Sequence, residues 1–152
     1  MVSIEEVSVK MKSKLIVIGL MVIASISLLA CSSPSNEISH EISCDDFMQG
    51  NNLTWIVSGV KAGDTVKAII CSNPTTGFRW ELAGINDQTV LKQDGDPEFV
   101  PPREQIPGAG GKEIWIFKAL QKGTSLVSLE YSQPWEGGEK AEWTFDITVT
   151  VD

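Results

Sequence analysis

The nine residues Trp143-Thr144-Phe145-Asp146-Ile147-Thr148-Val149-Thr150-Val151 decide the fold class of this chain. Aromatic and branched aliphatic residues alternate strictly with threonine and aspartate over the whole stretch. A period of two residues places all apolar side chains on one side of an extended backbone, which is the signature of a half-buried β-strand. The last segment of the chain is therefore predicted to be a strand with one face in a core.

Six more segments show the same alternation, or are short apolar runs bounded by turn residues, and they cover residues 53–58, 65–71, 78–82, 90–93, 113–121 and 124–132. The polar stretch 94–112, rich in proline and glycine, is predicted to be a long irregular connection. No segment after residue 30 keeps a helical period. About seven short strands separated by turns predict an all-β fold, an immunoglobulin-like β-sandwich, with Trp80, Trp115 and Trp143 in its core.

The composition limits the choice of partners. The chain has 152 residues, which suits one domain plus a leader, and it carries 20 acidic against 12 basic side chains. This negative balance repels the phosphate backbone and argues against nucleic acid as a partner.

The first thirty residues read as a lipoprotein-type signal peptide. A basic segment at 11–14 precedes an apolar run at 15–30, which is short for a membrane span. The run ends in Leu28-Leu29-Ala30-Cys31, which resembles a bacterial lipobox, and residues 1–10 are interpreted as an upstream start extension. We expect lipidation at Cys31, a polar tether over 31–40, an extracytoplasmic domain over 41–152, and anchoring to the cell membrane. The alternative is a plain signal peptide or a single anchor helix with an incidental cysteine.

Two further cysteines, Cys44 and Cys71, remain once Cys31 carries lipid. An even number of cysteines in an oxidising compartment is compatible with a disulfide, and a bridge here would contribute about 3 kcal/mol by the chain-entropy estimate. Two free thiols remain the alternative.

Catalytic and metal-binding patterns are absent from the sequence. The single histidine, His40, falls in the predicted tether, so neither a Ser-His-Asp triad nor a histidine-activated Cys71 can be assembled. The sequence has no second histidine and no pair of Cys-x-x-Cys motifs that could hold a metal ion. The segment Gly108-Ala109-Gly110-Gly111 lacks the Lys-Ser/Thr pair of a phosphate-binding loop. We therefore expect a protein that is not an enzyme and uses no metal or cofactor.

Three loops are the remaining candidates for function: the opening loop (residues 73–77), the glycine loop (108–111) and the Pro-Trp loop (133–136). In the opening loop, Asn73-Pro74 initiates a turn and Gly77 can close it, which leaves a short, uncharged and pre-shaped loop around Thr75 and Thr76. An even number of predicted strands separates each loop from the next, so all three are expected at one end of the sandwich. This end is called the loop face below.

The motifs Asn73-Pro74-Thr75-Thr76-Gly77-Phe78-x-Trp80, Gly108-x-Gly110-Gly111 and Pro134-Trp135-Glu136 resemble the three signatures of the chagasin family. The members of that family are reversible inhibitors of papain-like cysteine peptidases. The resemblance implies that the opening loop enters the active-site cleft, with Thr75 and Thr76 near the catalytic residues of the peptidase. It also implies that Trp135 stacks on an aromatic surface and that the glycine loop lies against substrate-binding backbone.

The chain departs from the family at one position, since Gln133 stands where an arginine usually precedes Pro-Trp. For several residues a purely structural role remains the alternative to contact with a peptidase. Gly110 and Gly111 could serve only the turn, and Phe78 could be a core or a contact residue. At the level of function, the alternative is an immunoglobulin-like surface lipoprotein that binds a wall component or another exported protein without inhibiting a peptidase. A monomer is expected.

Overall fold

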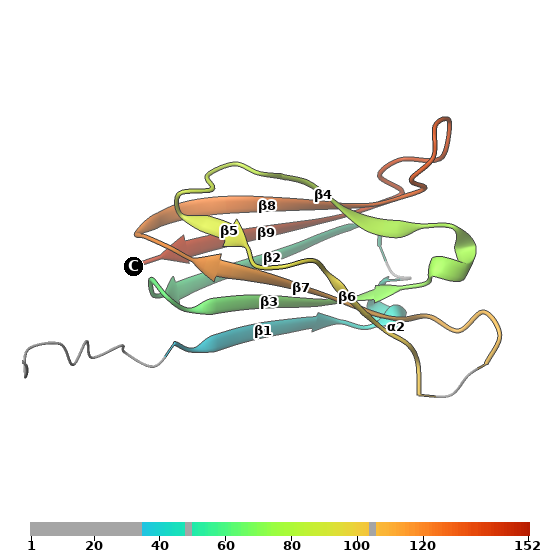
Figure 1. Cartoon of the computed structure of the whole chain (residues 1–152), viewed down its shortest axis with the longest axis horizontal. Helices are drawn as coiled ribbons and strands as arrows, with labels where there is room; N and C mark the ends of the chain where they lie inside the picture. The colour runs from blue at the N-terminus through green and yellow to red at the C-terminus, as the bar shows by residue number, and fades with distance from the viewer. Residues whose placement is uncertain (1–34, 48–49, 104–105) are drawn as a thin grey trace, which may run out of the picture. The chain divides into compact units, whose positions relative to one another are not determined.

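The structure, a computed structural model, describes residues 35–47, 50–103 and 106–152, and these residues form a two-layer β-sandwich (Figure 1). The predicted signal peptide and Cys31 lie outside the described residues. One sheet has the order β1 (Glu37–Ile42), β3 (Thr65–Ser72), β7 (Gly111–Ala119) and β5 (Leu91–Gln93), and β6 (Glu98–Val100) also pairs with β7. The other has the order β2 (Asn52–Val60), β9 (Trp143–Val151), β8 (Gly123–Ser132) and β4 (Arg79–Ile85).

The core lies between the two sheets and is built from the alternation seen in the sequence. Strands β3, β7, β8 and β9 bury every second side chain, so that Phe117 of one sheet and Phe145 of the other are fully enclosed. Trp80 and Trp115 are buried as predicted, whereas Trp143 is half-buried and packs against the edge of the core. The all-β sandwich prediction is confirmed.

The predicted tether is wrong at its C-terminal end, because β1 begins at Glu37. This strand pairs in parallel with β3, from Glu37 opposite Thr65 to Ile42 opposite Ile70. Only Ile42 of its side chains is buried, so the strand carries little of the apolar pattern that announces a strand. His40 is accordingly not in a tether; its ring stacks on Trp55 with the ring centroids 5.1 Å apart.

A second correction concerns residues 94–112, predicted as irregular, which contain β6. Both β5 and β6 run antiparallel to β7, with Gln93 opposite Phe117 and Glu98 opposite Ile114. Between these pairs one strand advances by five residues and the other by three, so β5 and β6 are two parts of one edge strand interrupted by a bulge. Because β5 and β6 run in the same direction and count as one strand, the number of strands between the loops stays even, as predicted.

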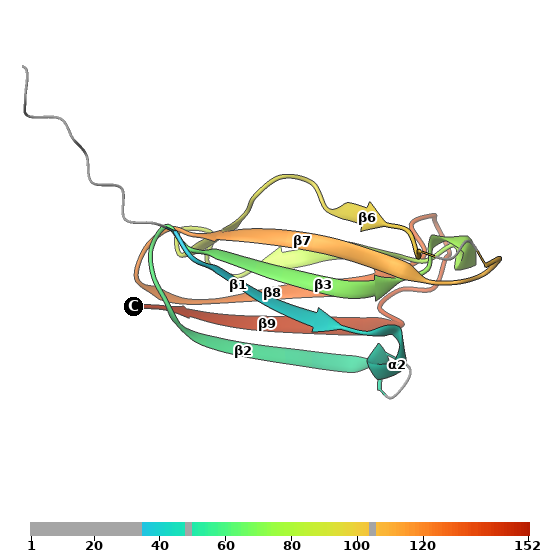
Figure 2. The same ribbon diagram turned by 90° about the horizontal axis from the view of Figure 1, so that it is seen from below.

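The three loops gather at one end of the sandwich, opposite the end where the C-terminus lies (Figures 1 and 2). The same end holds α2 (Cys44–Phe47), a single helical turn between β1 and β2 that the sequence pattern did not indicate.

Candidate functional site

The opening loop is a single turn of 3₁₀ helix, η1 (Pro74–Thr76), held by its own side chains. Asn73 caps the turn, since its Oδ1 accepts hydrogen bonds from Thr75 N (3.3 Å) and Thr75 Oγ1 (2.7 Å). Thr76 Oγ1 donates to Asn73 O at 2.7 Å. Gly77 closes the loop at φ +85°, a conformation that side-chain-bearing residues adopt only with strain. Because both threonine hydroxyls donate internally, their oxygens remain available to accept hydrogen bonds from a partner.

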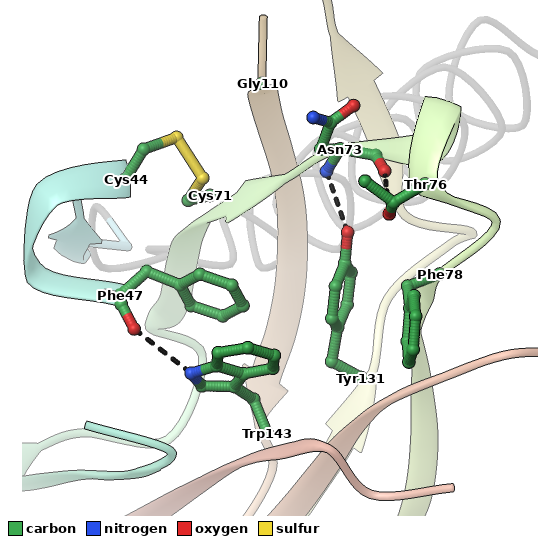
Figure 3. A pocket seen from close by; sticks show the side chains of 9 residues that line it. All are labelled: Cys44, Phe47, Cys71, Asn73, Thr76, Phe78, Gly110, Tyr131 and Trp143. Atoms are coloured by element: carbon green, nitrogen blue, oxygen red, sulfur yellow. Dashed lines mark hydrogen bonds between the residues drawn. A yellow bond between two sulfur atoms is a disulfide. The ribbon is translucent and has the colours of Figure 1, made fainter. Parts of the chain in front are cut away.

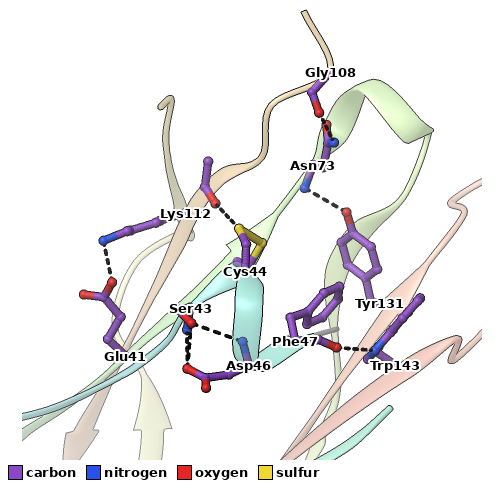
Figure 4. Close-up of a disulfide and its surroundings, with 12 residues drawn as sticks. Glu41, Ser43, Cys44, Asp46, Phe47, Asn73, Gly108, Lys112, Tyr131 and Trp143 are labelled. Atoms are coloured by element: carbon purple, nitrogen blue, oxygen red, sulfur yellow. Dashed lines mark hydrogen bonds and ion pairs between the residues drawn. A yellow bond between two sulfur atoms is a disulfide. The ribbon is translucent and has the colours of Figure 1, made fainter. Parts of the chain in front are cut away.

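The glycine loop is tied directly to the opening loop. Asn73 Nδ2 donates to Gly108 O at 2.8 Å, which joins residues 35 positions apart in the sequence (Figure 4). Gly108 is exposed, with φ +82°. Its carbonyl is therefore engaged with the opening loop while the rest of the residue faces solvent.

The other two glycines of the loop have packing reasons of their own. A Cβ on Gly110 would lie 3.2 Å from Cys44 Sγ, against the disulfide. Gly111 is the first residue of β7, buried opposite Ser72, and a Cβ there would collide with the carbonyl oxygen of Val100. Gly111 thus lies in the sheet, and close approach of β6 is enough to require a glycine.

The Pro-Trp loop places an exposed indole over the opening loop. Trp135 is 49% exposed, and a Cβ added to Gly77 would lie 2.7 Å from its Cη2 atom. Gln133 closes the loop at its base, since its Oε1 accepts a hydrogen bond from Glu139 N at 3.0 Å. The side chain of an arginine has no acceptor atom, so the side chain of Gln133 makes a contact that the usual family side chain cannot make.

These contacts confirm that the three loops form one continuous surface. The opening loop is at its centre, bonded to the glycine loop through Asn73 and in contact with the Pro-Trp loop through Gly77. Trp80 lies beneath this surface, and its Nε1 donates to Cys71 O at 2.9 Å, as expected of a core residue. Phe78 is half-buried and stacks on Tyr131.

Tyr131 is a residue of the site that the sequence pattern indicates only as part of the core. Its hydroxyl accepts a hydrogen bond from Asn73 N at 2.9 Å, at the base of the opening loop. The signal that could have revealed this contact is chemical, because a buried tyrosine hydroxyl usually has a hydrogen-bond partner.

A disulfide between Cys44 and Cys71 fixes α2 at the loop face (Figure 4). Phe47 of α2 stacks on Trp143 with ring centroids 4.7 Å apart, and its carbonyl accepts a hydrogen bond from Trp143 Nε1. Hydrogen bonds from the Ser43 hydroxyl and amide lower the pKa of Asp46 in the same turn. Between α2 and the opening loop lies a cavity of about 310 Å³ walled mainly by aromatic side chains and the disulfide (Figure 3).

Glu113 is the buried carboxyl group below the loops, and its burial raises its pKa above the ordinary value. In the part of the chain that the structure describes, no group of three His, Cys, Asp or Glu side chains is placed to hold a metal ion. No helix among the described residues is long and apolar enough to cross a membrane.

Comparison with known proteins shows which family this chain matches. Residues 59–149 match the model described as "Chagasin family peptidase inhibitor I42". The chain is 34% identical over 80 residues to Chagasin from Trypanosoma cruzi, covering 51% of this chain and 73% of that protein. It is 31% identical over 92 residues to Amoebiasin-2 from Entamoeba histolytica, covering 60% of this chain and 74% of that protein.

Solved structures show the same fold. The cysteine protease inhibitor EhICP2 from Entamoeba histolytica aligns with a TM-score of 0.55 and 21% identity over 79% of this chain and all of that one. PbICP-C, solved in complex with falcipain-2, aligns with a TM-score of 0.52 and 21% identity over 78% of this chain and all of that one. From the family match and the identities to curated relatives, the chain belongs to the chagasin family of peptidase inhibitors.

Proposed function

We propose that the loop face blocks the active-site cleft of a papain-like cysteine peptidase, reversibly and without a covalent bond. Family membership supports inhibition of this class of enzyme. The observation that carries the mode of inhibition is the joining of three loops into one surface through Asn73 and Gly77. A surface ordered before binding loses little conformational entropy on binding, which favours affinity.

Each loop has a distinct part in the proposed complex. Thr75 and Thr76 at the exposed tip enter the cleft and offer hydroxyl oxygens to donors of the enzyme. Trp135, large and half-exposed, provides an apolar contact beside the cleft, where tryptophan is frequently a hot spot. Gly108 allows close approach of backbone to backbone on the other side. One chain supplies all three loops, which supports inhibition by a monomer.

An inhibition assay tests the proposal. The chain from Ser32 to Asp152, whose described part forms one compact unit, should inhibit papain reversibly and remain uncleaved. Exchanging both Thr75 and Thr76 for glutamate should abolish inhibition, because charged side chains would be buried in the cleft without partners. Thr54→Glu, at an exposed position on β2, is the matched control and should leave inhibition unchanged. Absence of inhibition across several papain-family enzymes at micromolar inhibitor would refute the function.

We further propose that Cys31 carries a lipid that anchors the protein on an extracytoplasmic membrane face. The support is the lipobox-like sequence before Cys31, together with a disulfide in the domain, which suits an oxidising compartment. Metabolic labelling with a fatty-acid analogue should mark the wild type, and Cys31→Ser should lose the label and leave the membrane fraction. Equal membrane retention of both proteins would contradict the anchor.

A further inference from the structure

The opening loop stands on a cavity instead of on packed side chains. The cavity of about 310 Å³ is bordered by Asn73, Thr76 and Phe78 on the loop side and by Phe47, Tyr131 and Trp143 on the core side (Figure 3). Tightly packed interiors resist displacement because every neighbour would have to move, and this resistance is missing on the inner side of the loop. On this inner side, the position of the loop therefore depends on hydrogen bonds, while Trp135 contacts the loop at Gly77.

Asn73 takes part in the hydrogen bonds that hold the opening loop, and its backbone amide connects the loop to the core. Its side chain bonds Gly108 of the glycine loop and Thr75 of η1, but both of those partners are loop residues themselves. The amide of Asn73 instead donates to Tyr131 Oη at 2.9 Å, across the wall of the cavity (Figure 3).

Tyr131 is held firmly enough to act as a fixed point. It is 4% exposed in the central strand β8, opposite Trp80 on β4 and Trp143 on β9. Its ring stacks on Phe78 with centroids 5.4 Å apart and meets Phe47 edge-on at 5.5 Å. With strands on both sides and aromatic rings around it, the hydroxyl has a defined position.

We propose that Tyr131 is a positioning residue of the inhibitor: its hydroxyl sets the place of Asn73 and thereby the height and direction of the opening loop. This inference rests on the proposed function, in which the loop enters a peptidase cleft. Tyr131 itself lies in the core and acts through Asn73. Its hydroxyl can be removed alone, as Tyr131→Phe, which keeps the ring and its packing.

Without the hydroxyl, the partly buried amide of Asn73 loses its protein partner at the edge of an apolar pocket, and the loop populates other positions. An inhibitor that is competent to bind only part of the time binds more weakly by that fraction. An unpaired, partly buried amide corresponds to a population shift of roughly tenfold, so the inhibition constant of Tyr131→Phe against papain should rise by about that factor.

Trp143→Phe is the matched control for a merely structural effect. It also removes one hydrogen-bonding group from the same aromatic cluster, since Trp143 Nε1 donates to Phe47 O at 3.0 Å, but that bond does not reach the opening loop. Both variants should unfold at a lower temperature than the wild type. Only Tyr131→Phe should weaken inhibition when both are assayed well below their melting temperatures.

Amide hydrogen exchange followed by NMR gives a second readout that does not need a peptidase. The Asn73 amide should exchange at least about tenfold faster in Tyr131→Phe than in the wild type, and at the wild-type rate in Trp143→Phe. An inhibition constant within twofold of wild type for Tyr131→Phe, or equal weakening by both variants, would overturn the positioning role. If the wild type inhibits no papain-like enzyme, the proposed function fails, and Asn73 exchange alone decides whether Tyr131 fixes the loop.

Discussion

A methyl group added at Gly77 separates the opening loop from Trp135. Gly77 has φ +85°, where alanine is strained by about 1–2 kcal/mol. The new Cβ would also lie 2.7 Å from Trp135 Cη2, whereas ordinary contact begins at 3.4 Å, so the indole must withdraw by about 0.7 Å or more. Gly77→Ala therefore strains the backbone and displaces the exposed ring of the loop face.

Gly95→Ala is the matched control, because it shares only the first of these effects. Gly95 has φ +79° in the bulge between β5 and β6, and a Cβ there meets nothing within 4 Å. Both variants should lose about 4–8 °C of melting temperature per kcal/mol of backbone strain. Only Gly77→Ala should raise the inhibition constant against papain, by about 30-fold if the displaced indole is a hot spot contributing about 2 kcal/mol.

The outcome that refutes this reasoning is specific. If Gly77→Ala inhibits as tightly as Gly95→Ala, the indole of Trp135 either stays in place or contributes nothing to the complex. Progress curves with papain measure the inhibition constants, and thermal unfolding measures the stability of the same preparations.

Three further perturbations test other parts of the structure. Trp135→Ala should weaken inhibition by about 2 kcal/mol with little change in melting temperature, since the side chain is 49% exposed; unchanged inhibition would make the residue a loop filler. Replacing Cys44 and Cys71 together by alanine should lower the free energy of unfolding in urea by about 3–4 kcal/mol, given their separation of 27 residues, and a change below 1 kcal/mol would contradict the estimate. Because burial raises the pKa of Glu113, the folded state binds its proton more tightly than the unfolded state. The contribution of Glu113 to stability is therefore greatest at low pH and declines as pH rises from the ordinary glutamate range through the raised pKa. Glu113→Gln should remove that decline from the curve of unfolding free energy against pH, and parallel curves for the two proteins would refute the assignment.

The parts of the fold that sequence could predict are those with one face in the core. Strands β3 and β9, one from each sheet, alternate because each sheet is buried on one side only. Strand β1 gives no such signal, since it lies at a sheet edge with one buried side chain, Ile42. Strand β6 is three exposed residues, recognisable only from its pairing with β7.

The site shows the same division between local and tertiary information. The turn of the opening loop follows from Asn73, Pro74 and Gly77, whose backbone preferences are local. The bond from Asn73 to Gly108 and the contact of Gly77 with Trp135 join segments far apart in the chain, so only the folded arrangement reveals them. For the same reason Gly111 reads as a loop glycine in sequence and proves to be a sheet residue in the structure.

The parallel pairing of β1 with β3 places the N-terminus of the described domain at the end of the sandwich away from the loops. Glu37 lies beside Thr65 at the start of β3, and the opening loop follows the other end of that strand. The C-terminal strand β9 likewise finishes at the pole away from the loops (Figure 1). A bead, a fusion partner or a bilayer linked before Ser35 or after Asp152 is therefore joined to the domain at the end away from the three loops.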